Sequence, residues 1–132
     1  MISVFHRDPA VADILSDEPQ LRLCRGYDHN YILDPRADGA VCGEAWCGET
    51  GIALAFSTTQ PGVQLYTGNY VDDDAAPCGK GGVRYPRHGG FCLETQRFPD
   101  SPNRPGFPSA LLRPGEEYHE LTAYRFSVRE GI

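Results

Sequence analysis

Glu94 places a carboxylate in strand-like sequence, where glutamate is a poor choice for the backbone. In "GGFCLETQ" the alternation puts Gly90, Cys92 and Glu94 on one face and Phe91 with Leu93 on the other. The face of Glu94 is the less bulky one, which leaves room for a ligand beside the carboxylate. Two interpretations remain open: Glu94 is a catalytic group, or it is a solvent-facing residue on an ordinary strand.

Asp28 belongs to the polar cluster Asp28-His29-Asn30 of "GYDHN", directly before an apolar run. Such a cluster is a common turn signal, because Asp and Asn side chains bond to their own backbone. Alternatively, it begins a strand and points into a cleft, where an aspartate with a neighbouring asparagine can hold two adjacent hydroxyl groups of a sugar or polyol. His29 adds little to either interpretation, since no two of the four histidines have metal-ligand spacing.

Gln64 in "PGVQLY" shares a strand face with Tyr66, while Val63 and Leu65 lie on the other. A lone glutamine on a strand is usually a surface residue. An amide beside an aromatic ring also suits a sugar, because the ring stacks on the C–H face of the sugar and the amide bonds to its hydroxyl groups. We expect this strand to lie beside the strand that carries Glu94.

Short strands must position these side chains. Alternating or apolar runs, separated by turn-forming Gly, Pro and Asp, predict strands at 20–24, 30–34, 40–47, 51–59, 62–70, 89–96 and 118–128. One short helix is predicted over 9–15, with Asp8 as its N-cap. This succession of short strands predicts an all-β protein, an antiparallel β-sandwich or barrel, in a single domain over 1–132.

Composition excludes several classes of function. A formal charge of −6 provides no basic excess for nucleic acid or an anionic membrane surface. The sequence has no apolar stretch long enough to span a membrane, and we expect a soluble, cytoplasmic protein.

The five cysteines include no C-x-x-C pair, which disfavours a zinc site. Cys42 and Cys92 lie in apolar runs and are expected to be buried as small hydrophobic residues.

Four segments, taken together, resemble the C-terminal part of the aldose 1-epimerase (galactose mutarotase) family. They occur in the family's order: "GYDHNYIL", "TQPGVQLYTGNYVD", "GKGGVRYPRHGGFCLETQRFPDSPN" and "LRPGEEY". The resemblance extends from about Arg25 to about Val128, nearly the whole chain. It implies a large β-sandwich, the galactose mutarotase-like supersandwich, with the sugar in an open cleft. It also implies an isomerase that interconverts the α and β anomers of free hexoses such as galactose and glucose, with no metal and no cofactor.

The same resemblance assigns roles to the three candidates. Glu94 corresponds to the family's general base, and Asp28 and Gln64 correspond to residues that bind the sugar. The base takes the proton of the C1 hydroxyl while a second group protonates the ring oxygen, so the ring opens to the aldehyde. Rotation about C1–C2 and closure on the other face complete the reaction, which needs one group on each side of the C1–O5 bond.

The expected acid is a histidine in an N-terminal motif resembling "NHxYFNL", and none of His6, His29, His88 and His119 stands in such a motif. Family members are also much longer than this chain. Three hypotheses follow: a truncated aldose 1-epimerase, one half of a split enzyme, or a non-catalytic carbohydrate-binding β-domain. The resemblance implies an aldose as ligand. Half of a sandwich exposes sheet edges, so we expect a missing N-terminal half or a second copy of the chain as protein partner.

Overall fold

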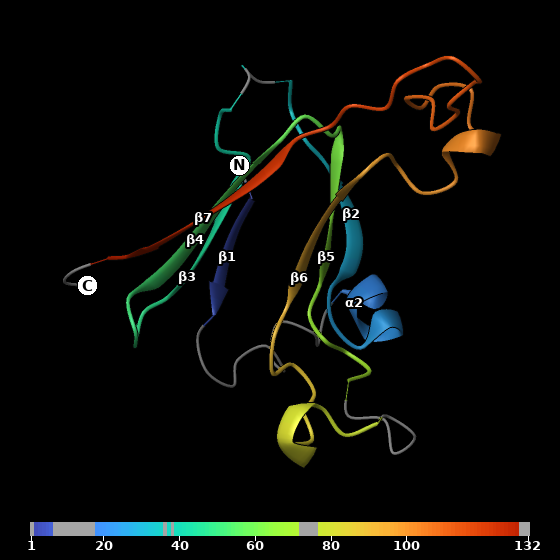
Figure 1. The fold of residues 1–132 in the computed structure, drawn as a ribbon. Helices are drawn as coiled ribbons and strands as arrows, with labels where there is room; N and C mark the ends of the chain where they lie inside the picture. Colours follow the sequence, from blue (N-terminus) through green and yellow to red (C-terminus); the bar gives the residue numbers. More distant parts are fainter. Residues whose placement is uncertain (1, 7–17, 36, 38, 72–76, 130–132) are drawn as a thin grey trace. The chain divides into compact units, whose positions relative to one another are not determined.

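A computed structural model of the chain describes residues 2–6, 18–35, 37, 39–71 and 77–129 (Figure 1). Within these residues, two sheets account for nearly all regular structure. The first has the order β1-β3-β4-β7, with β1 (Ile2–His6), β3 (Gly43–Cys47), β4 (Ile52–Thr58) and β7 (Thr122–Val128). The second has the order β2-β5-β6, with β2 (Asp28–Ile32), β5 (Gly62–Tyr66) and β6 (Cys92–Gln96). The all-β prediction is confirmed, since two sheets with almost no helix are the make-up of a β-sandwich.

The four-stranded sheet is antiparallel in two of its three pairings. Strands β3 and β4 form a hairpin, and β4 pairs antiparallel with β7, with Leu54 opposite Phe126 and Phe56 opposite Tyr124. Strand β1 lies outside the predicted strands, and its pairing with β3 is parallel.

Arg129, directly after β7, reaches back over this sheet. Its guanidinium lies 4.9 Å from the centre of the Trp46 ring and donates through Nη2 to Glu44 Oε2 at 2.9 Å. Glu44 and Trp46 alternate with buried Ala45 along β3, so both face the arginine. The contact ties the end of β7 to β3 across β4, in addition to the backbone ladder.

The three-stranded sheet follows the predicted alternation. Val63 and Leu65 are buried in β5, whereas Gln64 and Tyr66 are half-buried on the other face. In β6, Leu93 is buried and its neighbours Cys92 and Glu94 are exposed. The prediction that Cys92 is buried is therefore wrong, because Cys92 shares the exposed face of Glu94.

Residues 20–24, predicted as a strand, form helix α2 (Pro19–Cys24) instead. Pro19 stands at the first helical position, Glu18 accepts from Gln20 N as N-cap, and Arg25 ends the helix in the left-handed conformation. These residues at the helix ends determine the structure, because an alternation of apolar and polar residues over only five positions is weak evidence for a strand. The helix predicted over 9–15 lies outside the described residues. The described helices include none with the length and apolar character to cross a membrane.

The chain divides into two compact units. The first comprises Met1–Asp8, Ile32–Val63 and Thr95–Ile132, and the second comprises Pro9–Tyr31 and Gln64–Glu94. The four-stranded sheet belongs to the first unit, and α2 with most of the three-stranded sheet belongs to the second. Two 3-10 turns lie in the long loops, η1 (Lys80–Gly82) in the second unit and η2 (Ser101–Asn103) in the first. The single domain over 1–132 stays a prediction.

Candidate functional site

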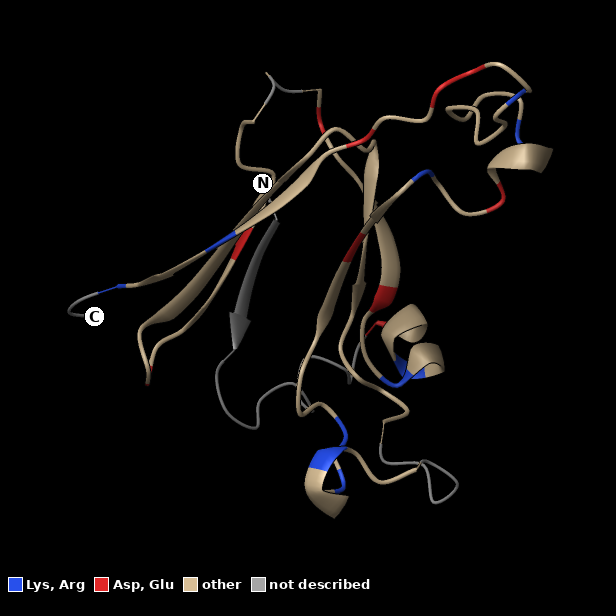
Figure 2. Ribbon diagram, viewed as in Figure 1, with Lys and Arg blue, Asp and Glu red and all other residues tan. Residues whose placement is uncertain are grey.

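Asp28, Gln64 and Glu94 all lie in the second unit, one on each strand of the three-stranded sheet. Asp28 begins β2, Gln64 is central in β5 and Glu94 is central in β6. Because β5 is the middle strand, Gln64 stands on the strand that adjoins both carboxylate-bearing strands. The acidic segments of β2 and β6 in Figure 2 are these two residues.

Strand pairing brings Asp28 and Gln64 together. Thr67 N donates to Tyr27 O at 3.0 Å, and Leu33 N donates to Pro61 O at 2.9 Å, which makes β2 and β5 antiparallel. Gln64 is then a diagonal neighbour of Asp28 on one face, within side-chain reach. Gln64 Nε2 donates to Asp28 Oδ1 at 2.8 Å. The amide nitrogen faces the carboxylate because an ionised carboxylate can only accept.

The carbonyl oxygen of the Gln64 side chain is buried without a hydrogen-bond partner in the described part of the chain. Buried polar atoms are nearly always paired, so an orphan acceptor needs an explanation. Here it belongs to the amide that holds Asp28, and its capacity to accept a hydrogen bond is unused among the described residues.

Asp28 is the first residue of a strand and does not lie in a turn, so the turn interpretation of "GYDHN" is wrong for this residue. Its backbone N–H donates to His29 Nδ1 at 3.1 Å. A ring nitrogen that accepts carries no proton, so this bond places the proton of a neutral His29 on Nε2. Alternation along β2 turns the side chain of His29 away from the face of Asp28.

Glu94 is exposed, and its carboxylate makes no hydrogen bond or ion pair with the described residues. The residues on either side of it are held: Leu93 is buried, and Thr95 shares a hydroxyl hydrogen bond with Thr122 at 2.7 Å. Thr122 in turn bonds to the hydroxyl of Thr58 at 2.9 Å. A fixed backbone therefore presents a carboxylate with free acceptor oxygens, which is what a general base requires.

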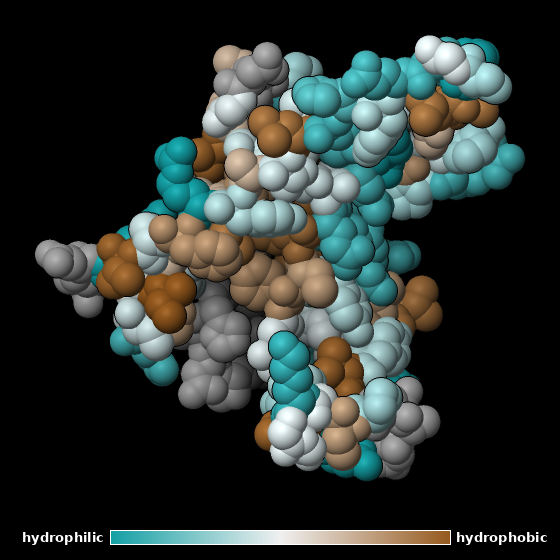
Figure 3. Space-filling model, in the orientation of Figure 1, coloured by the Kyte–Doolittle hydropathy of each residue, from teal (hydrophilic) through white to brown (hydrophobic). Residues whose placement is uncertain are grey.

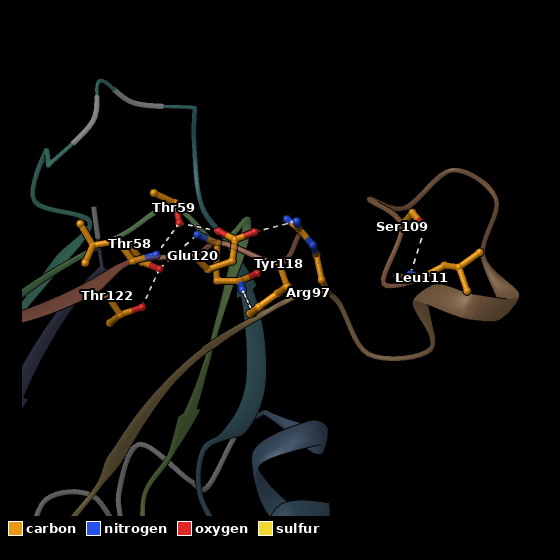
Figure 4. Close-up of polar contacts among 10 residues, drawn as sticks. Thr58, Thr59, Arg97, Ser109, Leu111, Tyr118, Glu120 and Thr122 are labelled. Atoms are coloured by element: carbon orange, nitrogen blue, oxygen red, sulfur yellow. Dashed lines mark hydrogen bonds and ion pairs between the residues drawn. The ribbon is translucent and has the colours of Figure 1, made fainter. Parts of the chain in front are cut away.

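A polar cluster in the first unit holds the chain just beyond β6 (Figure 4). The carboxylate of Glu120 accepts from Arg97 Nη2 at 2.7 Å and from the hydroxyl of Thr59. Its side chain is only 14% exposed, so the pair is largely shielded from water. Gln60 Nε2 donates to Tyr118 Oη at 2.7 Å beside it. Sequence reasoning missed this cluster, because its members are far apart in the chain and belong to no motif.

The described residues contain no group of three or more His, Cys, Asp and Glu side chains that could hold a metal ion. All five cysteines are free thiols. Asp28, Gln64 and Glu94 carry carboxylate and amide oxygens, which are acceptors suited to a ligand rich in hydroxyl groups.

The chain belongs to the aldose 1-epimerase family, whose model matches residues 5–125. It is 50% identical over 103 residues to galactose mutarotase from Mus musculus and to galactose mutarotase from Homo sapiens, in each case 78% of this chain and 30% of the relative. It is 37% identical over 118 residues to aldose 1-epimerase from Escherichia coli (strain K12), or 87% of this chain and 33% of that protein. The resemblance found in the sequence is confirmed. The chain spans about a third of the length of these curated relatives.

Proposed function

We propose that this chain supplies the general base and part of the sugar site of an aldose 1-epimerase, which interconverts the α and β anomers of a hexose such as galactose or glucose. The observation that carries the proposal is the contrast between two carboxylates of one sheet. Asp28 is held by Gln64, as a binding group should be, while the carboxylate of Glu94 has no partner among the described residues.

In this proposal, Asp28 accepts hydrogen bonds from sugar hydroxyl groups, and the orphan oxygen of Gln64 accepts another. Glu94 removes the proton of the C1 hydroxyl as the C1–O5 bond breaks, and an acid delivers a proton to O5. The product is the open-chain aldehyde with Glu94 protonated. After rotation about C1–C2, O5 attacks the other face of C1, and both protons return to their sources.

The acid on O5 is assigned to a histidine outside the described residues, on a companion polypeptide or in sequence beyond this chain. The alternative is a non-catalytic carbohydrate-binding domain that holds the sugar and lacks the acid. This alternative is favoured by one observation: none of the four histidines stands in an "NHxYFNL"-like motif. Both versions keep an aldose as the partner and the cytoplasm as the expected location.

Polarimetry on freshly dissolved α-D-galactose and α-D-glucose tests the proposal, combined with an NMR titration of the protein with either sugar. A mutarotation rate above that of buffer supports catalysis by this chain. Saturable binding with the rate of buffer supports the non-catalytic alternative or a split enzyme. Absence of both binding and rate would contradict all three.

A further inference from the structure

Asn69 is completely buried, and each polar group of its side chain is paired. Nδ2 donates to Cys24 O at 2.8 Å and to Tyr27 O at 3.0 Å. Oδ1 accepts from Thr67 Oγ1 at 2.8 Å. The amide therefore joins the last carbonyl of helix α2, the residue before β2 and the chain just beyond β5, all within the second unit.

These bonds converge on the peptide unit that precedes Asp28. Tyr27 O accepts both from Asn69 Nδ2 and from the backbone N–H of Thr67, each at 3.0 Å. Tyr27 N donates to Thr67 Oγ1 at 3.0 Å. On the other side of the peptide bond, Asp28 N donates to the ring of His29. A peptide unit is planar, so fixing its carbonyl and its N–H fixes the position of the Asp28 Cα. The strand conformation of β2, which begins at Asp28, then sets the direction in which the side chain leaves the strand.

Gly26 shows how closely the two segments fit. A Cβ atom at this position would lie 2.2 Å from Asn69 Oδ1 and 2.8 Å from Thr67 Oγ1, and the φ angle of +147° is one that L side chains rarely adopt. Only glycine lets the "GYD" segment lie against the "TGN" segment. The two segments thus form one buried hydrogen-bonded unit at the start of β2.

We propose that Asn69, together with the hydroxyl of Thr67, is a positioning residue for Asp28. It orients the carboxylate toward Gln64 and the sugar without touching the sugar itself. This inference rests on the proposed sugar site, but its first readout does not. If Asn69 sets the direction of Asp28, its loss must weaken the bond from Gln64 Nε2 to Asp28 Oδ1, whether or not a sugar binds.

The test uses the side-chain amide signals of Gln64 in ¹H–¹⁵N NMR spectra of the full chain. The variant Asp28→Ala gives their positions without the bond. We expect Asn69→Ala and Thr67→Val to move the signals toward those positions, and Thr67→Ser, which keeps the hydroxyl, to restore them. The exposed amide of Asn103, which donates to Asp100 Oδ1 at 2.6 Å, provides the matched control, and Asn103→Ala should leave them unchanged.

The second readout is the affinity for galactose, which should fall about tenfold or more in Asn69→Ala and Thr67→Val, because Asp28 loses the orientation in which it accepts from the sugar. Wild-type Gln64 signals in a folded Asn69→Ala variant would overturn the inference. If Asn69→Ala does not fold, the two Thr67 variants decide. Gln64 signals that are the same in Thr67→Val and Thr67→Ser would overturn the inference. If the Gln64 signals respond as expected but the unaltered chain binds no sugar, the proposed function fails and the positioning role stands.

Discussion

Gln64 donates to Asp28 through its amide nitrogen at 2.8 Å, while the oxygen of the same amide is buried and unpaired among the described residues. One side chain thus orients a carboxylate and offers an acceptor beside it. An unpaired buried acceptor costs about 1–3 kcal/mol, and a ligand hydroxyl group would remove this cost on binding. Strand β5 thus buries Val63 and Leu65 on one face and places the polar side chain of Gln64 on the other.

Replacement of Gln64 should weaken sugar binding and leave the stability of the fold nearly unchanged. Gln64→Met removes both the donor to Asp28 and the unpaired oxygen, so we expect the free energy of unfolding to change by less than about 1 kcal/mol. Sugar affinity should fall about tenfold, because the acceptor oxygen and the bond that orients Asp28 both disappear. Urea denaturation and an NMR titration with galactose measure the two effects. The control is Gln20→Met on the exposed side of α2, and equal affinity of both variants would refute the binding role of Gln64.

Glu94→Gln should remove any mutarotation and leave stability intact. The carboxylate is exposed and unpaired within the described chain, so the free energy of unfolding should stay within about 0.5 kcal/mol of the original. The amide cannot take a proton from the C1 hydroxyl, and the polarimetric rate should drop to that of buffer. Glu117→Gln, at another exposed glutamate, should keep the rate. Activity that survives Glu94→Gln would refute the assignment of the base.

Arg97 should contribute more to stability than other arginines with the same kind of partner. Arg97→Met leaves Glu120, whose side chain is 14% exposed, with the Thr59 hydroxyl alone, and we expect a loss of about 1–3 kcal/mol in urea denaturation. Arg104 pairs with Asp100 at the surface, where both side chains are well exposed, so Arg104→Met should cost less than about 1 kcal/mol. Equal losses would show that the shielded pair has no special weight.

Cys47 should react as an activated thiol. Hydrogen bonds from the Thr50 side chain, and from the backbone N–H groups of Thr50 and Glu49, lower the pKa of Cys47 below its ordinary 9.0. A lower pKa means more thiolate at a given pH, so the pH profile of alkylation by iodoacetamide should lie to the acid side of an ordinary thiol. Thr50→Val should shift the profile toward higher pH. Exposed Cys78 in the same chain serves as reference, and an unchanged Cys47 profile in Thr50→Val would contradict the stated cause.

The sheet formed by β4 and β7 should promote self-association. Phe126 and Val128 are 72% and 69% exposed, and they stand opposite Leu54 and Ile52 on one face. Figure 3 shows hydrophobic side chains gathered over this end of the two strands. We expect concentration-dependent dimers or larger species in sedimentation velocity, because exposed apolar surface next to an edge strand favours pairing.

A charge on this face should oppose the association. Phe126→Lys should shift the distribution toward monomer, whereas Arg125→Lys, on the opposite face of the same strand, should not. A chain that stays monomeric at all concentrations would count against both the self-association and the expected need for a protein partner.

Alternation predicted β5 and β6 well, because each has one buried face and one more open face. The strand predicted over 51–59 is found as β4, although its two buried residues, Ala53 and Phe56, lie on opposite faces. Alternation failed at α2, where a five-residue alternation is too short to outweigh Pro19 and a left-handed residue at Arg25. The bond from Gln64 to Asp28 could not be predicted, since it depends on the register of two strands 36 residues apart in sequence. Asn69 was inside a recognised motif, but nothing local shows that its amide reaches Cys24 and Tyr27. The ion pair of Arg97 and Glu120 could not be predicted either, because the two residues are far apart in the sequence and become neighbours only in the folded chain.

The discontinuous make-up of the two units has a consequence for how the chain acquires its structure during synthesis. The backbone passes from one unit to the other after Asp8, Tyr31, Val63 and Glu94, so neither unit is built from one contiguous stretch of the chain. Strand β4 gains its β7 neighbour only when residues 122–128 have left the ribosome, long after β4 itself. Until then the nascent chain carries an open strand edge, and its distant pairings predict slow folding with a dependence on chaperones.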